Sequence, residues 1–349
     1  MYKVYCGKIF TDKQVIELLR PNLNGPRWGL WNDKIPTLSQ EIVSVTDKPD
    51  EADFFLFPHD YNQLLSEVSY ITEFAHDAEI RGKKVVIFFP GDRDTAVVIP
   101  NAIIFRNSQY KNRRAINEIM LPGYVEDMGK GGVSVREKST NGMPAVGFCG
   151  WADFKTIKQG ISLTVKVCIG NFKMLLGEKD VLPRRQGLWW RRKILPILSK
   201  SRLVASNFII RTSYSGNEKT IALDPERARK EYVENIVHSD FTLCVKGDGN
   251  FSTRFYETLS LGRVPLFVDT DCPLPLEGVI DYSKFVFRVN YTDYKRLPEL
   301  LSAFYHKCSP EEWKAMQKRA REVFENYLRM DSFLKYTFTK EFLGKYLKG

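Results

Sequence analysis

Short, strongly apolar runs alternate with segments of helical periodicity along most of this 349-residue chain. The N-terminal part holds four such runs: KVYC (3–6), ADFFLFP (52–58), KKVVIFF (83–89) and AIIFR (102–106). Runs of this kind are typical of strands buried on both faces of a sheet. Helical patterns separate them at residues 12–20 and 61–81. Because strand–helix–strand units make right-handed crossovers, the alternation predicts an α/β fold with a mostly parallel sheet.

The pattern is interrupted once and then starts again. Residues 130–143, KGGVSVREKSTNGM, are rich in Gly, Ser and Lys and read as a loop or linker. After it we expect strands at residues 145–149, 208–211, 241–245, 264–268 and 285–289, and helices at residues 161–175, 188–199, 225–238 and 253–261. Pro225 suits the first turn of its helix, and Asp224 is placed to cap it.

The chain is expected to end in helices at residues 310–327 and 332–347. We therefore predict two α/β domains, residues 1–143 and 144–328, with residues 329–349 forming a helical segment that returns to the first domain. Ligands of open α/β sheets bind at the carboxyl ends of the strands, so the site is expected in the cleft between the domains.

The net charge of +10 favours an anionic partner, such as nucleic acid, anionic lipid or a phosphorylated small molecule. Six cysteines without any C-x-x-C pair, and only four histidines, disfavour a disulfide framework or a structural zinc site. The N-terminus lacks the apolar core of a secretory signal, and no apolar run approaches the roughly 20 residues that span a bilayer. We expect a cytoplasmic protein, or one peripheral to a membrane.

The stretch GNFSTRFYETLSLGRVPLFVDTD, residues 249–271, combines features of an anion-binding loop. The glycine-rich lead-in, with Gly249 and Asn250, lets the backbone approach a ligand, and Ser252 can cap the helix that follows. Arg254 then lies in the first turn, where free N–H groups and the helix dipole favour phosphate. Glu257, one turn on, can accept hydrogen bonds from ribose hydroxyls. The alternative is an exposed Arg254–Glu257 ion pair on an ordinary helix surface.

The same stretch resembles the C-terminal core of the exostosin family of glycosyltransferases, family 47. That family's pattern is roughly S-x-R-x-x-E-[AST]-L-x-x-G-x-[IV]-P-[VL], followed by an Asp, Leu-Pro and Ile-[DN]-[WY]. The matching positions are Ser252, Arg254, Glu257, Leu259, Gly262, Val264, Pro265, Leu266, Asp269, Leu274, Pro275, Leu276, Ile280, Asp281 and Tyr282. The resemblance is dense over about residues 225–290, and ADFFLFP resembles the family's N-terminal strand. The family's lumenal anchor and extracytoplasmic cysteines have no counterpart here, so the resemblance is to a soluble bacterial- or viral-type member.

The resemblance implies a GT-B fold, with two Rossmann-like domains whose mostly parallel sheets face a cleft. It implies an inverting transferase that takes a sugar from a UDP- or GDP-linked donor, with Glu257 on the ribose and Arg254 on the diphosphate. The sugar would pass to a hydroxyl of a glycan or lipid-linked acceptor held by the first domain, in polysaccharide or glycan synthesis. In this fold no cofactor is required, because the helix dipole and basic side chains neutralise the leaving group.

Asp269 and Asp271 follow a predicted strand as D-T-D, the way a metal-binding D-x-D motif begins in the other major glycosyltransferase fold. Hard cations need several oxygen ligands, and only these two carboxylates are in view. The interpretation we favour is that Asp269 orients the loop and Asp271 is solvated, with no metal bound.

An inverting transfer needs a base for the acceptor hydroxyl. His59 and Asp60 lie at the exit of the strand at residues 52–58, and either could serve; the alternative is that Asp60 caps a helix and His59 lies on the surface. Asp92, after the next strand, is a weaker candidate. Asp153, at the exit of the first strand of the second domain, could contact the acceptor or cap a helix.

The segment RRQGLWWRRKIL, residues 184–195, surrounds two tryptophans with cations. Three interpretations stay open: contact with the donor phosphates, contact with anionic lipid, or buried tryptophans with a solvated basic face. We expect Arg191 or Arg192 to contact phosphate, and Arg211 is a comparable candidate. The lysine-bearing amphipathic C-terminal segment could likewise lie on a membrane instead of on the first domain.

Two other functions remain open on the sequence. One is a different enzyme on the same architecture, such as a nucleotide-sugar epimerase or phosphorylase, for which no pyridoxal-lysine or hydrolytic signature is found. The other is a non-catalytic polyanion-binding protein, argued from the charge alone. No nucleic-acid recognition motif supports it, so nucleic acid is not an expected partner.

Overall fold

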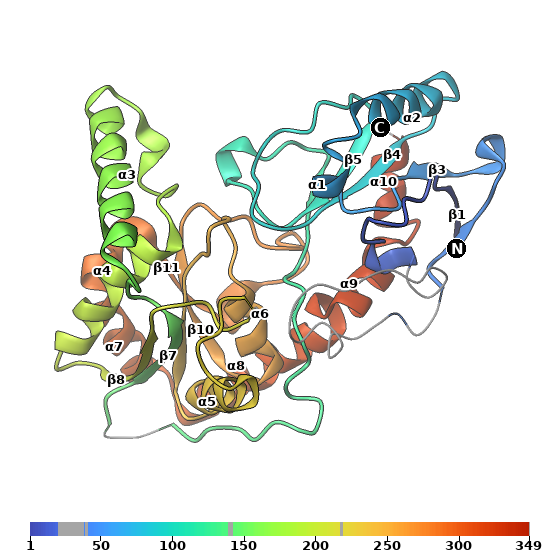
Figure 1. Cartoon of the computed structure of the whole chain (residues 1–349). Coiled ribbons are helices and arrows are strands. Elements are labelled where there is room, and N and C mark those ends of the chain that lie inside the picture. The colour runs from blue at the N-terminus through green and yellow to red at the C-terminus, as the bar shows by residue number, and fades with distance from the viewer. Residues whose placement is uncertain (20–37, 39–40, 139–141, 217–218, 349) are drawn as a thin grey trace.

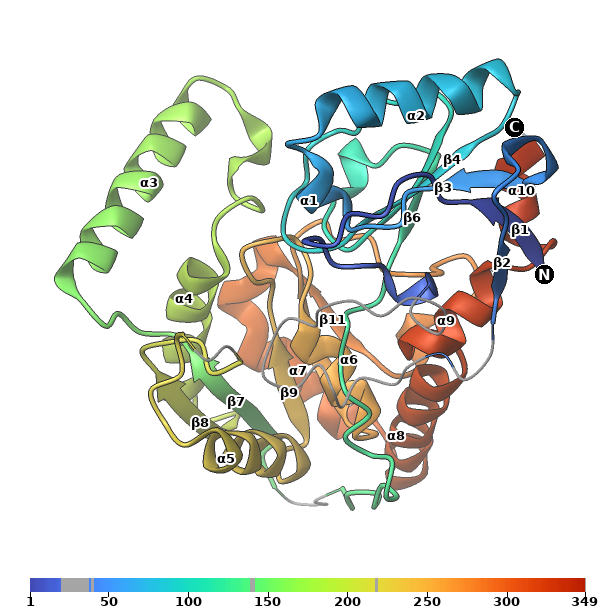
Figure 2. The ribbon, with the colours of Figure 1, turned by 45° about the vertical axis from the view of Figure 1, so that its right-hand side comes forward.

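The computed structural model describes residues 1–19, 38, 41–138, 142–216 and 219–348. These residues form two parallel β-sheets, each flanked by helices, which lie beside one another (Figures 1 and 2). The predicted α/β fold with two Rossmann-like units, as in GT-B enzymes, is confirmed by these sheets. In the described part of the chain no helix is both long and apolar enough to cross a membrane.

The first sheet has six parallel strands in the order β2-β1-β3-β4-β5-β6. The strands are β1 (Tyr2–Tyr5), β2 (Val43–Val45), β3 (Phe54–Leu56), β4 (Val85–Phe89), β5 (Ala102–Arg106) and β6 (Glu118–Met120). Successive side chains of a strand point to opposite faces. Accordingly Phe55 packs in one core with Phe74 of α2 (Val68–Ile80), which follows the short helix α1 (Tyr61–Leu64). Phe54 packs in the core of the opposite face.

That opposite face is covered by the end of the chain. Helices α9 (Met330–Thr337) and α10 (Leu343–Lys348) follow the second domain in sequence but lie against the first sheet (Figure 1). Phe338 stacks on Phe88 and Phe105, and Leu343 is fully buried in the same core. The apolar side chains of this segment are therefore used in packing on the first sheet.

The second sheet has five parallel strands in the order β11-β10-β9-β7-β8. They are β7 (Ala145–Trp151), β8 (Ala205–Arg211), β9 (Phe241–Cys244), β10 (Val264–Asp269) and β11 (Phe287–Asn290). The helices of this domain are α3 (Ile157–Leu175), α4 (Gly187–Lys200), α5 (Pro225–Val237), α6 (Thr253–Ser260), α7 (Leu297–Lys307) and α8 (Pro310–Val323). Asp224 caps α5 by accepting from the Arg227 N–H, and Pro225 lies in the first turn, as predicted.

Several local predictions were wrong. Residues 12–19 hold only the short 3-10 helix Glu17–Leu19 in place of the helix expected at 12–20, of which Arg20 lies outside the described residues. The long helix expected at 61–81 is split into α1 and α2. β2 and β6 were not predicted, since each has only three residues, too few to show a period. Helix α7 was also missed.

Candidate functional site

Two arginines lie together at the carboxyl edge of the second sheet. Arg254 stands in the first turn of α6, and its guanidinium lies over the Phe148 ring at 4.2 Å from the ring centre. Its Nη2 donates to the Cys149 carbonyl at 2.8 Å, whereas its Nε is buried with no hydrogen-bond partner among the described residues. Gly150, with φ +151°, makes room for this side chain, because a Cβ there would lie 2.8 Å from the Arg254 Nη2.

Arg191 approaches the same place from α4. Its Nη1 donates to the Trp151 carbonyl at 3.0 Å and its Nη2 to the Lys246 carbonyl at 3.3 Å. Its Nε, like that of Arg254, is buried and has no hydrogen-bond partner in the described part of the chain. Burial, and next the charge of Arg254, lower the pKa of Arg191 to about 10.

The geometry of these two side chains points to an anion. Neither Arg191 nor Arg254 forms an ion pair with a carboxylate among the described residues, and each is held by backbone carbonyls. Two neighbouring cations repel one another, and each leaves a buried N–H unsatisfied, which is costly. A bound anion such as a diphosphate would satisfy both groups, and the free N–H groups at the start of α6 add to the attraction.

Glu257 lies one turn after Arg254 but does not pair with it. Its Oε2 accepts a hydrogen bond from the Tyr232 hydroxyl of α5 at 2.5 Å. Burial raises the pKa of Glu257, while the Tyr232 hydrogen bond and the Arg254 charge act against that rise. The alternative of an exposed Arg254–Glu257 ion pair therefore does not fit the structure. Tyr232 orients Glu257, whose Oε1 accepts no hydrogen bond from the described residues and can accept one from a ligand hydroxyl.

The lead-in to α6 differs from expectation. Ser252 makes no side-chain capping bond, so its predicted cap is wrong. Gly249 does permit a close approach, but its neighbour is Asp92 of the first domain: its N–H donates to the Asp92 Oδ1 at 2.9 Å, and a Cβ would lie 2.6 Å from the Asp92 Cα. Asn250 is buried and donates from its backbone N–H to the Ser108 Oγ at 2.8 Å. These two donor-site candidates thus hold the domains together, and their N–H groups are occupied.

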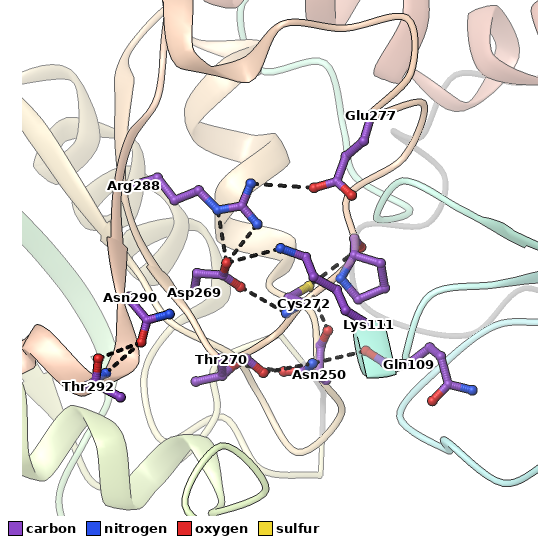
Figure 3. Close-up of polar contacts among 11 residues, drawn as sticks. Gln109, Lys111, Asn250, Asp269, Thr270, Cys272, Glu277, Arg288, Asn290 and Thr292 are labelled. Carbon is purple, nitrogen blue, oxygen red and sulfur yellow. Dashed lines mark hydrogen bonds and ion pairs between the residues drawn. The ribbon is translucent and has the colours of Figure 1, made fainter. Parts of the chain in front are cut away.

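Asp269 also serves this domain contact (Figure 3), and the Asp271 carbonyl accepts from the Lys111 N–H at 2.9 Å. Asp269 accepts from Arg288 Nη2 at 2.7 Å and from Lys111 Nζ of the first domain at 3.2 Å, both at its Oδ2. Its Oδ1 accepts from the Cys272 N–H at 2.9 Å, which fixes the loop after β10. The described residues contain no group of three or more potential metal ligands. The structure thus places Asp269 in the loop-orienting role that the sequence favoured.

The candidate bases fall in different surroundings. His59 is fully buried, where the sequence suggested a surface or catalytic residue; its Nε2 accepts from the Phe10 N–H at 2.8 Å and its Nδ1 donates to the Gln14 carbonyl at 3.1 Å. Burial lowers the pKa of His59, so it stays neutral with both nitrogens occupied and cannot act as the base. This prediction is corrected: His59 anchors the N-terminal segment.

Asp60 and Asp153 are both bound locally. The Asp60 Oδ1 accepts from the N–H and the Nδ2 of Asn62, each at 2.8 Å, so this carboxylate caps α1. Burial raises the pKa of Asp60. Asp153 is exposed, forms an ion pair with Arg192 and accepts from the Phe154 N–H at 2.9 Å. Within the described residues no hydrogen bond or ion pair joins either carboxylate to Arg191 or Arg254. Asp60 remains the better candidate, because its Oδ2 accepts no hydrogen bond in that part of the chain.

Asp92, the weaker candidate on the sequence, contacts the second domain directly. It follows β4 and touches the loop that leads into α6 through Gly249. Burial raises the pKa of Asp92, with a further rise from Asp248. The Tyr214 hydroxyl, whose pKa is raised by burial and by Glu257, is also within electrostatic reach of Arg254, Asp92 and Arg191. Asp92 therefore shares one electrostatic environment with the second-domain site.

Of the other basic candidates, neither joins the site. Arg211 is buried and pairs with Glu231 at 3.0 Å, which ties β8 to α5. Arg192 is exposed, stacks on Phe154 at 4.0 Å and pairs with Asp153. Trp189 and Trp190, which directly precede Arg191 and Arg192 in sequence, are buried in the core of the second domain. Of the three interpretations of this segment, the structure shows the buried tryptophans, and it places Arg191 beside Arg254.

Two residues that the sequence did not single out, Tyr232 and Lys246, also lie in this region. Tyr232 orients Glu257, but nothing distinguishes it in sequence from other aromatic residues on a helix. Lys246 is buried at the exit of β9, where its Nζ donates to the Tyr110 hydroxyl of the first domain at 2.6 Å. Burial lowers the pKa of Lys246 to about 8. Its place at a strand exit was the one signal that could have marked it.

Comparison with known proteins agrees with the second-domain site. The sequence model of the exostosin GT47 domain matches residues 191–304, which include Arg191, Arg254 and Glu257. A relative described as an Exostosin-1 homolog from Caenorhabditis elegans is 35% identical over 104 residues, which is 30% of this chain and 26% of that protein. The chain thus spans about a quarter of this relative's length. These matches confirm the predicted resemblance to exostosin glycosyltransferases.

Similar solved structures are more distant. One is Anabaena Alr3699/HepE in complex with UDP, with 10% identity, full coverage of both chains and a TM-score of 0.38. Another is the pneumococcal O-GlcNAc transferase GtfA in complex with UDP and GlcNAc, with 10% identity, a TM-score of 0.31, and coverage of 85% of this chain and 57% of GtfA. Because both TM-scores are low, the fold is assigned from the two sheets themselves.

Proposed function

We propose that this chain, whose residues 191–304 match the sequence model of the exostosin GT47 domain, transfers a sugar from a nucleotide-diphosphate donor to a hydroxyl group, with inversion. The observation that carries the proposal is the Arg191–Arg254 pair: two neighbouring cations, each with a buried Nε that has no hydrogen-bond partner among the described residues. A diphosphate bears the charge and the acceptor oxygens that this pair lacks.

In this proposal the donor diphosphate lies between Arg191 and Arg254, at the start of α6. The bond between the sugar and the diphosphate breaks in the transfer, and negative charge grows on the leaving diphosphate. The two guanidiniums are already fixed by backbone carbonyls, so they stabilise that charge without rearranging. The arginines supply the positive charge, and the proposal includes no metal.

Glu257 is proposed to accept hydrogen bonds from the ribose hydroxyls of a UDP- or GDP-linked donor. We expect Glu257→Gln to weaken nucleotide binding about tenfold, because a hydrogen bond to a charged acceptor is lost. Titration calorimetry with the ribonucleoside diphosphate and its 2′,3′-dideoxy analogue measures this. The wild type should prefer the ribonucleotide, and the variant should bind both alike. An unchanged preference in Glu257→Gln would place the ribose elsewhere.

The acceptor is proposed to be a glycan or glycolipid hydroxyl presented from the first domain, with Asp92 as its base and Asp60 as the second candidate. Asp92 is favoured because it adjoins the loop into α6. A base acts in its deprotonated form, so activity should rise with pH through the pKa of Asp92, which burial has raised above the ordinary aspartate value.

Asp92→Asn should lower kcat by about a hundredfold and leave nucleotide binding unchanged. Asp60→Asn is the matched control. It replaces the other candidate base, which lies at a neighbouring strand exit and whose pKa is also raised by burial. Transfer to an acceptor, measured across pH with saturating donor, separates the two. Full activity of Asp92→Asn together with a large loss in Asp60→Asn would move the role to Asp60.

The experiment that tests the function as a whole is a panel of nucleotide sugars, scored for thermal stabilisation and for slow donor hydrolysis with and without EDTA. A stabilising UDP- or GDP-sugar that is also hydrolysed supports a transferase. Stabilisation without turnover to any acceptor or to water would favour a binding protein, and conversion of the sugar without its release would favour an epimerase.

A further inference from the structure

Helix α3 (Ile157–Leu175) carries an apolar face that packs against nothing in the described structure. In Figures 1 and 2 the helix stands away from the body of the second domain. None of its residues is buried, and only Leu163 and Val167, half-buried, pack against the core. The helix is therefore attached along one side and open to its surroundings on the other.

The exposed side is apolar along its whole length. We define the α3 apolar face as Ile157, Ile161, Val165, Ile169 and Phe172, together with Leu176, which directly follows the helix. Their spacing of three or four residues puts them on one side of a helix. All six are exposed, with Ile157 at 83% and Phe172 at 62%. The ring of Phe154 and the first part of this face line a concavity of about 440 Å³.

The charges of α3 are all of one sign. Lys158, Lys166 and Lys173 lie beside the apolar face, and the sequence of the helix contains no aspartate or glutamate. All three lysines are exposed. Lys173 forms an ion pair, at 3.7 Å, with Glu178, which lies beyond the end of the helix. Lysine stems can lie along apolar surface while their ammonium groups reach headgroups.

From this we infer that α3 docks the protein on an anionic membrane surface, with its apolar face in the acyl boundary and its lysines at the headgroups. An exposed apolar stripe flanked by cations is the pattern of helices that lie in a membrane interface. The charge pattern favours lipid over a second copy of the chain, since two α3 helices would bring only cations to their contact. The net charge of +10 also favours binding to an anionic surface.

The test is cosedimentation of the full chain with vesicles, without nucleotide, so that its outcome is independent of the proposed catalysis. Vesicles of phosphatidylcholine alone are compared with vesicles that contain 30% phosphatidylglycerol. We expect binding to the anionic vesicles only, weakened by salt. The double variant Val165→Glu with Phe172→Glu should abolish vesicle binding. The control, Val98→Glu with Ile116→Glu, makes the same change at exposed apolar residues outside α3 and should leave binding intact.

A second set of variants tests the lysines. Replacing Lys158, Lys166 and Lys173 by alanine should weaken binding on the order of a hundredfold. The same change at Lys318, Lys335 and Lys340, exposed lysines of the C-terminal part, should have a much smaller effect. The inference is overturned if the wild type does not bind anionic vesicles, if the Val165/Phe172 variant binds as well as the wild type, or if sedimentation velocity shows a dimer that this variant dissociates.

Discussion

Replacing Arg254 with alanine should lower kcat/KM for sugar transfer by about a thousandfold, the scale of losing a preorganised charge at the leaving group. The reason is the position of this side chain: it is stacked on Phe148, bound to the Cys149 carbonyl, and left with an unpaired Nε. Steady-state transfer from the nucleotide sugar identified by the panel measures the loss. Most of it should appear in kcat, because the charge on the diphosphate grows in the transition state.

Two variants control this prediction. Arg192→Ala removes an exposed arginine next to Arg191 that pairs with Asp153, and it should change kcat/KM by less than about threefold, as expected for a surface ion pair. Arg254→Lys keeps the charge but loses the planar, two-pronged donor geometry, so it should restore only part of the activity. An Arg254→Ala protein that folds normally and transfers sugar at the wild-type rate would rule out the proposed role.

Replacing Glu118 with alanine should lower the free energy of unfolding by about 3–5 kcal/mol, because it leaves a buried cation without its partner. Arg106 ends β5 fully buried, and its Nη1 lies 2.6 Å from the Glu118 Oε1. Its Nε donates to the Ser108 carbonyl and its Nη2 to the Arg93 carbonyl, and its Nη1 also donates to the Thr95 carbonyl. The pair thus fixes the loop that carries Asp92, and the loss should reach activity as well as stability.

Urea unfolding followed by circular dichroism measures this effect. Glu79→Ala is the matched control, since Glu79 is an exposed carboxylate of α2 whose neighbour His76 is 3.9 Å away, and it should cost less than about 1 kcal/mol. A loss in Glu118→Ala no larger than that of the control would mean that water reaches Arg106 in the variant.

The strands buried on both faces were predictable from sequence because length, apolarity and flanking turn residues agree. Phe54 and Phe55 illustrate this, since each packs in a different core. The three-residue strands β2 and β6 could not be found that way. The boundaries of the two domains remain a prediction, although α9 and α10 do lie on the first sheet.

Site residues were predictable from the sequence only where the succession of loop, helix and strand around them indicates their role. Arg254 and Glu257 fall in the order loop, helix, strand, and the structure places them one turn apart beside Arg191. His59 could not be judged, because its partners Phe10 and Gln14 lie some fifty positions away in sequence. Gly249 was misjudged for a similar reason: sequence shows that a close approach is needed, but not that the approaching group is Asp92.

The most direct measurement is a crystal structure of the chain with a bound nucleoside diphosphate, UDP or GDP. The account predicts phosphate oxygens within about 3 Å of the Nε atoms of both Arg191 and Arg254, and ribose hydroxyls at Glu257. A diphosphate bound elsewhere, with both Nε atoms still unpaired, would contradict it.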